Sequence, residues 1–162
     1  MLASMSLDTP KHQEFDGRGL RFAIVAARFN EALVQSLVRH ARDTLEASGA
    51  ATPVIERVPG SAELPYAAAA LIEHSNFDAI LVIGVVIAGD TNHHNIIGDS
   101  TAIALQELSV RKQIPVINGI LVVNTLAQAE ARAGTEINRG NEFAQSALEM
   151  ALFKNKWKTT NQ

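Results

Sequence analysis

The 162-residue sequence contains no cysteine, which excludes disulfide bonds, thiolate metal ligands and a cysteine nucleophile. Aromatic residues are few, at 5% of the chain, and charged residues make up only 19%. The formal net charge is -3, and both signs are scattered along the chain without a basic stripe. This charge pattern argues against nucleic acid and against an anionic membrane surface as partners.

The sequence also lacks an apolar run long enough to span a membrane. The longest, from Ala79 to Gly89, is too short to cross a bilayer. A signal peptide would need an apolar segment near the start, where the chain instead carries Asp8, Lys11, His12, Glu14, Asp16 and Arg18. We therefore expect a cytoplasmic protein with a polar N-terminal tail, residues 1–19, and a single domain, residues 20–158, large enough to bury a core.

One apolar stretch organises the rest of the chain. Residues 79–87 are almost wholly apolar and rich in β-branched side chains, the pattern of a strand buried on both faces of a parallel sheet. Residues 89–92, Gly-Asp-Thr-Asn, follow with the turn and N-cap chemistry that begins a helix. His93 and His94 are thus predicted in the first turn of that helix, just beyond the strand. Open α/β sheets bind their ligands at this position.

Strands and helices alternate along the chain. Apolar patterning and turn signals predict strands at about 21–27, 52–58, 79–87 and 115–122, and helices at about 31–48, 61–74, 91–112, 125–133 and 140–156. No hairpin signal joins neighbouring strands, so right-handed helical crossovers between parallel strands are expected. The predicted fold class is α/β: a three-layer α/β/α sandwich with a four-stranded parallel sheet, similar to flavodoxin.

The loops at the carboxyl ends of these strands should meet at one edge of the sheet. We assign to that edge the segments 28–30, 60–63, 89–94 and 118–119. Each has a simpler interpretation: Phe29 could be a core side chain, Pro-Gly-Ser-Ala-Glu a plain turn and cap, and the two histidines surface residues. Metal binding by His93 and His94 is disfavoured, since adjacent helical residues point about 100° apart and no third histidine lies nearby.

Short segments in a fixed order, between about residues 20 and 151, carry the most specific information. They are Ala27-Arg28-Phe29-Asn30, Val58-Pro59-Gly60-Ser61-Ala62-Glu63-Leu64-Pro65, Gly84-Val85-Val86-Ile87 with 89–93, Gly119-Ile120-Leu121, Arg132-Ala133-Gly134-Thr135, Asn138-Arg139-Gly140 and Ser146-Ala147-Leu148-Glu149-Met150. Each is a weak signal alone. In this order and combination they resemble the lumazine synthase family of riboflavin biosynthesis.

The resemblance implies a transferase that condenses 5-amino-6-(D-ribitylamino)uracil with 3,4-dihydroxy-2-butanone 4-phosphate to 6,7-dimethyl-8-ribityllumazine, with release of phosphate and water. It implies no metal and no organic cofactor. His93 matches the family's catalytic histidine, and a side chain that titrates near neutrality suits the proton transfers of imine formation and ring closure. His94 stands where an aromatic residue is commoner, so we assign it a packing or rim role.

The resemblance also implies how the two substrates are bound. The pyrimidine and its ribityl chain are assigned to Phe29, Ser61, Ala62, Glu63, Val85, Val86, Ile87 and Asn118. In this assignment Phe29 stacks on the ring and Asn118 reaches over it from a neighbouring subunit. The phosphate is assigned to Asp90, Thr91, Arg132 and Arg139, at a helix N-terminus whose N–H groups suit an anion.

A few positions depart from the family's pattern. Ala88 stands where arginine is common and Asn118 where phenylalanine is frequent, and the turn at 134–140 is one residue shorter than a common form. Two other classes of function stay open, and the departures at Ala88 and Asn118 support only the second. A flavodoxin-like module would bind a flavin or nucleotide without chemistry, and a shell-forming protein would keep the fold without the activity.

The helix expected from Ser61 to Ile72 is apolar nearly all round, which indicates that it is covered on more than one side. In the family, five subunits form a ring with active sites between neighbours, and many members pack such rings into a sixty-subunit icosahedral capsid. We therefore expect a homopentamer with large apolar interfaces, with the shell and an association with riboflavin synthase as further expectations of the resemblance.

Overall fold

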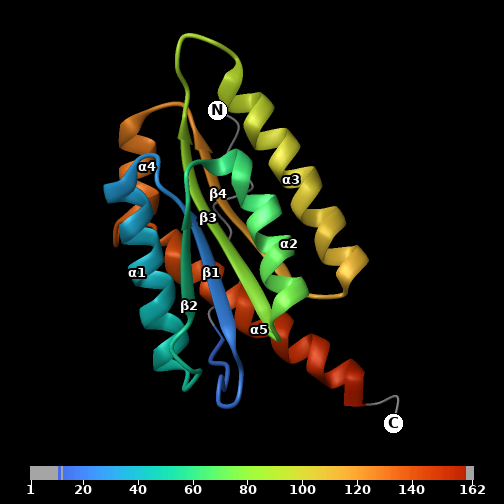
Figure 1. Ribbon diagram of the computed structural model, residues 1–162. Helices are drawn as coiled ribbons and strands as arrows, with labels where there is room; N and C mark the ends of the chain where they lie inside the picture. Colours follow the sequence, from blue (N-terminus) through green and yellow to red (C-terminus); the bar gives the residue numbers. More distant parts are fainter. Residues whose placement is uncertain (1–10, 12, 160–162) are drawn as a thin grey trace.

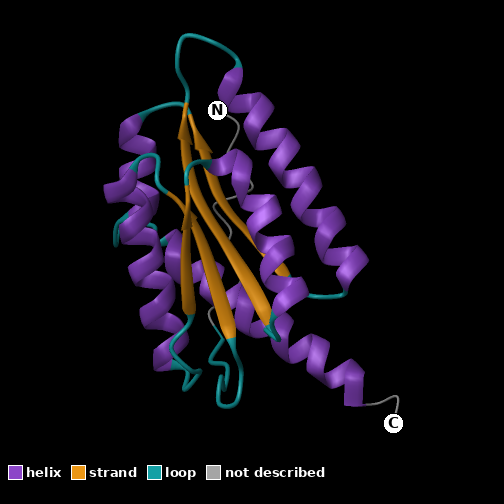
Figure 2. Ribbon diagram, in the orientation of Figure 1, coloured by secondary structure: helices purple, strands orange, loops and turns teal. Residues whose placement is uncertain are grey.

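The computed structural model, which describes residues 11 and 13–159, is a parallel sheet between two layers of helices (Figures 1 and 2). The strands β1 (Phe22–Ala27), β2 (Val54–Val58), β3 (Ala79–Ile87) and β4 (Val116–Val123) form a four-stranded sheet in the order β2-β1-β3-β4. All pairings are parallel. The predicted fold class, a three-layer α/β/α sandwich with a four-stranded parallel sheet, is confirmed.

The two faces of the sheet are covered by different helices (Figure 1). One face packs against α1 (Glu31–Ala47), α4 (Leu126–Ala133) and α5 (Arg139–Thr159). The other packs against α2 (Leu64–His74) and α3 (His93–Lys112), with the short 3-10 helix η2 (Ser61–Glu63) leading into α2. Since every crossover returns the chain to the same end of the sheet, the loops that follow β1, β2 and β3 share one edge.

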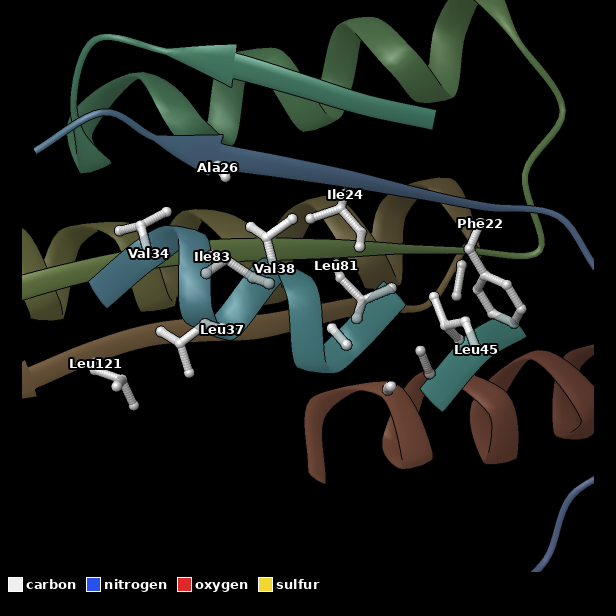
Figure 3. Packing of buried hydrophobic residues seen from close by; sticks show 14 of the residues in the cluster. Phe22, Ile24, Ala26, Val34, Leu37, Val38, Leu45, Leu81, Ile83 and Leu121 are labelled. Atoms are coloured by element: carbon white, nitrogen blue, oxygen red, sulfur yellow. The ribbon is translucent and has the colours of Figure 1, made fainter. Parts of the chain in front are cut away.

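β3 lies at the centre because its sequence supplies apolar side chains to both layers. Leu81 and Ile83 belong to the cluster under α1, and Ile80 and Val82 belong to the cluster under α2 and α3. Figure 3 shows the first cluster, in which Phe22, Ile24 and Ala26 of β1 and Leu81 and Ile83 of β3 face Val34, Leu37, Val38 and Leu45 of α1. Fully burying each large aliphatic side chain contributes about 1.5–3 kcal/mol relative to exposure.

The structure corrects one expectation about a loop. Asn118 and Gly119 do not follow β4 but lie within it, paired in register with Val82 and Ile83. An Asn-Gly pair is a common turn signal, yet here the glycine serves packing. A Cβ at position 119 would stand 2.7 Å from the carbonyl oxygen of Val82 and 2.9 Å from the ring of Phe143, so no larger residue fits beneath α5.

Several element bounds also differ from the expected ones. The helix expected from residue 61 begins as η2, and α2 proper starts at Leu64. Helix α3 starts at His93 rather than 91, and α5 continues to Thr159. None of the described helices has the length and hydropathy needed to cross a membrane.

Residues 1–10 and 12 of the expected N-terminal tail lie outside the described residues. In the described part of that segment, Phe15 packs against the core cluster under α1. The N–H of Gly17 donates a 2.9 Å hydrogen bond to the carbonyl of Ser48, at the end of α1.

Candidate active site

A cavity of about 350 Å³ lies beside the carboxyl ends of β1, β2 and β3. Its walls come from the loop after β1, the turn into η2, the end of β3 and the first turns of α3. The lining residues are Phe29, Asn30, Gly60, Ser61, Ala62, Glu63, Val85, Val86, Ile87, His93 and Ile97. The sheet thus gathers segments that are far apart in the sequence at the edge where open α/β sheets bind ligands.

The loop after β1 is held in place by Asn30. Its backbone is in the left-handed region, with φ of 55°, which asparagine adopts more readily than most residues. Its side-chain amide donates a 2.8 Å hydrogen bond to the carbonyl oxygen of Val85 on β3. The neighbouring Phe29 is 70% exposed, so the interpretation of Phe29 as a core side chain is wrong. Its ring stands at the cavity wall as an available stacking surface.

The turn into α2 is fixed by Glu63 and by close packing at Gly84. A carboxylate oxygen of Glu63 accepts a 2.8 Å hydrogen bond from the N–H of Gly60, which closes the turn. Ser61 is buried, and a Cβ at position 84 would lie 2.6 Å from its hydroxyl oxygen. A side chain at position 84 would therefore displace Ser61. Glycine allows the turn to pack against β3 and keeps the polar groups of the turn at the cavity.

The two histidines of α3 have different surroundings. His93 lines the cavity, whereas a ring nitrogen of His94 lies 3.3 Å from the carbonyl oxygen of Thr91 in the loop before the helix. Adjacent helical side chains diverge by about 100°, so only one of the pair can face the cavity. Among the described residues, no group of three or more His, Cys, Asp or Glu side chains is placed to hold a metal ion.

The remaining assigned residues do not line this cavity. Asp90 and Thr91 are exposed in the loop before α3, and Asn118 is exposed on β4, where its side-chain oxygen accepts a 3.0 Å hydrogen bond from the N–H of Ile120. Arg132 lies on α4 and donates to the carbonyl of Gln128 at 3.0 Å. No lysine or arginine is among the residues lining the cavity.

Arg139 is also directed elsewhere. It begins α5 and pairs with Glu142 at 2.5 Å. Both side chains line a separate cavity of about 630 Å³ between α5 and the N-terminal segment, which includes Phe15. In a single chain, Arg132 and Arg139, the two cations assigned to phosphate binding, therefore lie outside the cavity that His93 lines.

Three lining residues were given no role from the sequence, although the first two lie in segments assigned to this edge: Asn30, Gly60 and Ile97. Asn30 could have been found, because an asparagine directly before a helix often has a structural hydrogen-bonding role. Ile97 follows His93 by four residues and so shares its helical face. Gly60 matters through its backbone, which no residue pattern reveals.

The amino-acid sequence was compared with known protein families and with individual proteins. The family model for 6,7-dimethyl-8-ribityllumazine synthase matches residues 19–155. This chain belongs to the lumazine synthase family. It is 46% identical over 140 residues to the 6,7-dimethyl-8-ribityllumazine synthase of Aquifex aeolicus, covering 84% of this chain and 91% of the relative.

Other lumazine synthases match over a similar length. The enzyme of Stenotrophomonas maltophilia strain K279a is 43% identical over 145 residues, covering 86% of this chain and 94% of its own. That of Thermococcus gammatolerans is 38% identical over 137 residues, covering 85% and 89%. The cavity beside His93 therefore lies within the part of the chain that matches the lumazine synthase family.

Proposed function

We propose that this chain condenses 5-amino-6-(D-ribitylamino)uracil with 3,4-dihydroxy-2-butanone 4-phosphate to 6,7-dimethyl-8-ribityllumazine, releasing phosphate and water. The observation that carries the proposal is the cavity that joins the exposed ring of Phe29, the polar turn at Ser61 and Glu63, and His93 at one edge of the sheet. At about 350 Å³ it is within the usual size range of small-molecule sites.

The cavity suits the pyrimidine substrate in its chemistry. The face of Phe29 offers a stacking surface for the ring. Val85, Val86 and Ile87 end β3 at the cavity, and their peptide groups can bond to the ring's edge with specificity. Ser61 and Glu63, with the backbone around Ala62, supply hydrogen-bonding groups for the hydroxyls of the ribityl chain.

The reaction requires an amine and a ketone to form an imine, phosphate to leave, and a ring to close. The cavity contributes mainly by orienting the reactants, since fixed geometry converts an encounter in solution into an intramolecular step. His93 moves protons between the reacting groups, a contribution typically worth about 10²–10⁴-fold. His94, turned towards the carbonyl of Thr91, takes no direct part.

The phosphate is held where two subunits meet. The N-terminus of α3, preceded by Asp90 and Thr91, offers peptide N–H groups to an anion. The carboxylate of Asp90 would repel the phosphate by about 1 kcal/mol in water and about 4 kcal/mol at an effective dielectric of 20 for unit charges 4 Å apart. A cation must offset this repulsion. We infer that a neighbouring subunit supplies Arg132, with Arg139 and Asn118, because none of them lines the cavity of its own chain.

The assembly that brings subunits together is proposed to be a homopentamer. One chain leaves apolar side chains exposed on several elements, including Tyr66 on α2 at 80% exposure and Ile96, Ile103 and Val110 on α3. The α3 residues recur every seven positions, which is typical of a helix packed along a helical partner. Light scattering should give a mass near 5 × 17.4 kDa for a ring, or a far larger mass for a shell of rings. An active monomer would contradict the shared site.

A turnover assay with both substrates tests the function. We expect lumazine fluorescence and phosphate to appear together, faster than in the spontaneous reaction, and only when both substrates are present. A flavodoxin-like binding module would instead hold a flavin tightly and give no lumazine. A shell protein without activity would assemble and give only the spontaneous rate.

A further inference from the structure

A second cavity, of about 440 Å³, lies at the opposite end of the sheet from His93. It is bounded by the amino ends of β1 and β3, the end of α2 and the last turns of α5, which pass beneath the sheet in Figure 1. The lining residues are Arg21, Ile72, Ser75, Asn76, Phe77, Asp78, Ile114, Lys154, Asn155 and Lys158. In a chain of net charge -3, this lining contains three cations and one carboxylate.

Arg21 is an exposed residue whose guanidinium is positioned at this cavity by two contacts. Its guanidinium lies 5.3 Å from the centroid of the Phe77 ring, a cation–π contact, and one terminal nitrogen donates to the carbonyl of Asn76 at 3.1 Å. Within the described part of the chain, its other terminal nitrogen and Nε have no hydrogen-bond acceptor. A guanidinium whose remaining N–H groups have no protein acceptor is suited to the oxygens of phosphate or carboxylate.

Lys154 is nearly buried, with only 13% of its side chain exposed, but its charge is weakly compensated. Its ammonium lies 3.5 Å from the carbonyl oxygen of Phe77 and 3.7 Å from the carboxylate of Asp78. The pKa of Lys154 is lowered, chiefly by burial and also by the charge of Lys158, while Asp78 raises it in part. An additional anion would therefore meet an ammonium whose two protein partners lie 3.5 and 3.7 Å away.

Asp78 is the carboxylate nearest to Lys154, and each of its oxygens also accepts a hydrogen bond from another residue. One accepts a 2.7 Å hydrogen bond from the backbone N–H of Arg21, and the other accepts one of 3.2 Å from the side chain of Asn155. The carboxylate thus ties β1, β3 and α5 together. The positive charges of Arg21, Lys154 and Lys158 exceed its single negative charge.

We propose that this cavity binds a small oxyanion of the phosphate class, anchored by Arg21 and Lys154 with Lys158 at the rim. The ligand is either inorganic phosphate or a small phosphate ester, whose organic part would contact Ile72, Phe77 and Ile114. The site is formed within one subunit and lies at the opposite end of the sheet from His93. It is separate from the proposed reaction and does not depend on it.

Isothermal titration calorimetry with inorganic phosphate at constant ionic strength tests the site. All proteins should carry Arg132→Ala, which removes the arginine proposed to hold phosphate in the active site. On this background, Arg21→Gln and Lys154→Met each remove one anchor, and Lys156→Met removes a charge from the same helix outside the cavity lining. Thermal unfolding without phosphate checks that each variant is folded.

We expect phosphate binding to persist in Arg132→Ala alone and with Lys156→Met. Arg21→Gln and Lys154→Met should each weaken it about tenfold or more, the smallest loss expected for one charge-assisted hydrogen bond. Equal affinity in all four proteins, or no binding in Arg132→Ala alone, would overturn the proposal. Titration with ribose 5-phosphate separates the two ligand sources: tighter binding than inorganic phosphate indicates an ester, and equal or weaker binding indicates phosphate itself.

A second measurement needs no substitution at the site. Acetic anhydride labelling followed by peptide mass spectrometry should show that phosphate protects Lys154 and leaves Lys112, which pairs with Glu73 elsewhere on the surface, unprotected. Equal labelling of Lys154 with and without phosphate would also overturn the proposal. Neither result depends on lumazine formation, so a failure of the proposed reaction and a failure of this site are distinguishable.

Discussion

The side-chain amide of Asn30 donates a 2.8 Å hydrogen bond to the carbonyl of Val85, and this bond ties the loop that carries Phe29 to the end of the central strand. The loop could otherwise move with respect to β3, because Phe29 itself is largely exposed. Asn30 therefore sets the width of the cavity between the aromatic ring and the strand. Asn30 is therefore a positioning residue: it holds the loop that carries Phe29 and does not itself contact the reacting atoms.

Replacing Asn30 separates its two roles. Asn30→Ala loses the hydrogen bond and places an alanine at a positive φ, for an expected loss of about 1.5–3.5 kcal/mol in the free energy of unfolding. Asn30→Gly keeps the backbone conformation at less cost and loses the same bond. Both should raise KM for the pyrimidine more than for the butanone phosphate, whereas Asn30→Ala should be the less stable protein in urea unfolding. Unchanged KM values in both variants would remove Asn30 from this role.

The two histidines of α3 should differ in their effect on rate. His93→Ala is expected to lower kcat by about 10²-fold or less, near the low end for a general acid–base group. The loss is limited because binding and orientation of the reactants remain. His94→Ala should do much less, since its ring lies against the carbonyl of Thr91. Steady-state rates decide this, and a larger loss from His94→Ala would reverse the assignment.

Arg132→Ala should weaken the butanone phosphate far more than the pyrimidine. A charge-assisted hydrogen bond is worth about 1.5–3 kcal/mol, which corresponds to about 10- to 150-fold in affinity. Inorganic phosphate should compete with the butanone phosphate in the parent protein and hardly at all in the variant. If phosphate inhibited both proteins equally, Arg132 would have no part in holding the anion.

Gly84→Ala tests the close packing beneath the cavity. The added Cβ would lie 2.6 Å from the hydroxyl oxygen of Ser61 and 3.3 Å from a methyl of Leu64, so the turn into α2 must shift. Such overpacking typically costs about 1–3 kcal/mol, and KM for the pyrimidine should rise as Ser61 moves. Gly89→Ala is the matched control, since nothing lies within 4 Å of its added Cβ. Its stability should change by less than about 0.5 kcal/mol, and equal effects of the two changes would contradict this account.

Most of the fold could be predicted from local patterns of apolar and turn-forming residues. β3 is almost continuously apolar and β-branched, so its strand and its central place could be predicted. The helix expected at about 31–48 is α1, and Gly49 just beyond it has a φ of 93°, the left-handed conformation typical of the residue after a helix. Asn118 and Gly119 were misplaced because Asn-Gly has the same appearance in a turn and in a strand crossed closely by an aromatic ring. Only the position of Phe143, far along the chain, distinguishes the two cases.

The candidate site could be predicted only in part. The strand-end loops gather Phe29, Ser61 and His93 because parallel strands end at one edge, which is a consequence of topology. Arg132 and Asn118 lie outside that cavity. Sequence patterning alone does not indicate whether a residue contributes to the cavity of its own subunit or to that of a neighbour. The bond from Asn30 to Val85 was also missed, since it depends on the tertiary approach of two strands' ends.

The central claim is that lumazine forms in the cavity beside His93, and blocking that cavity tests it most directly. Ala62 is exposed at the cavity wall, so Ala62→Trp can occupy the space without entering the core. The exposed Ala47, at the far end of α1, provides Ala47→Trp as a control. The measurement is the initial rate of lumazine formation from both substrates, with mass and thermal unfolding checked for each protein. We predict that Ala62→Trp falls to the spontaneous rate while Ala47→Trp keeps the parent rate, whereas an undiminished rate in a folded, assembled Ala62→Trp protein would contradict the assignment of the active site.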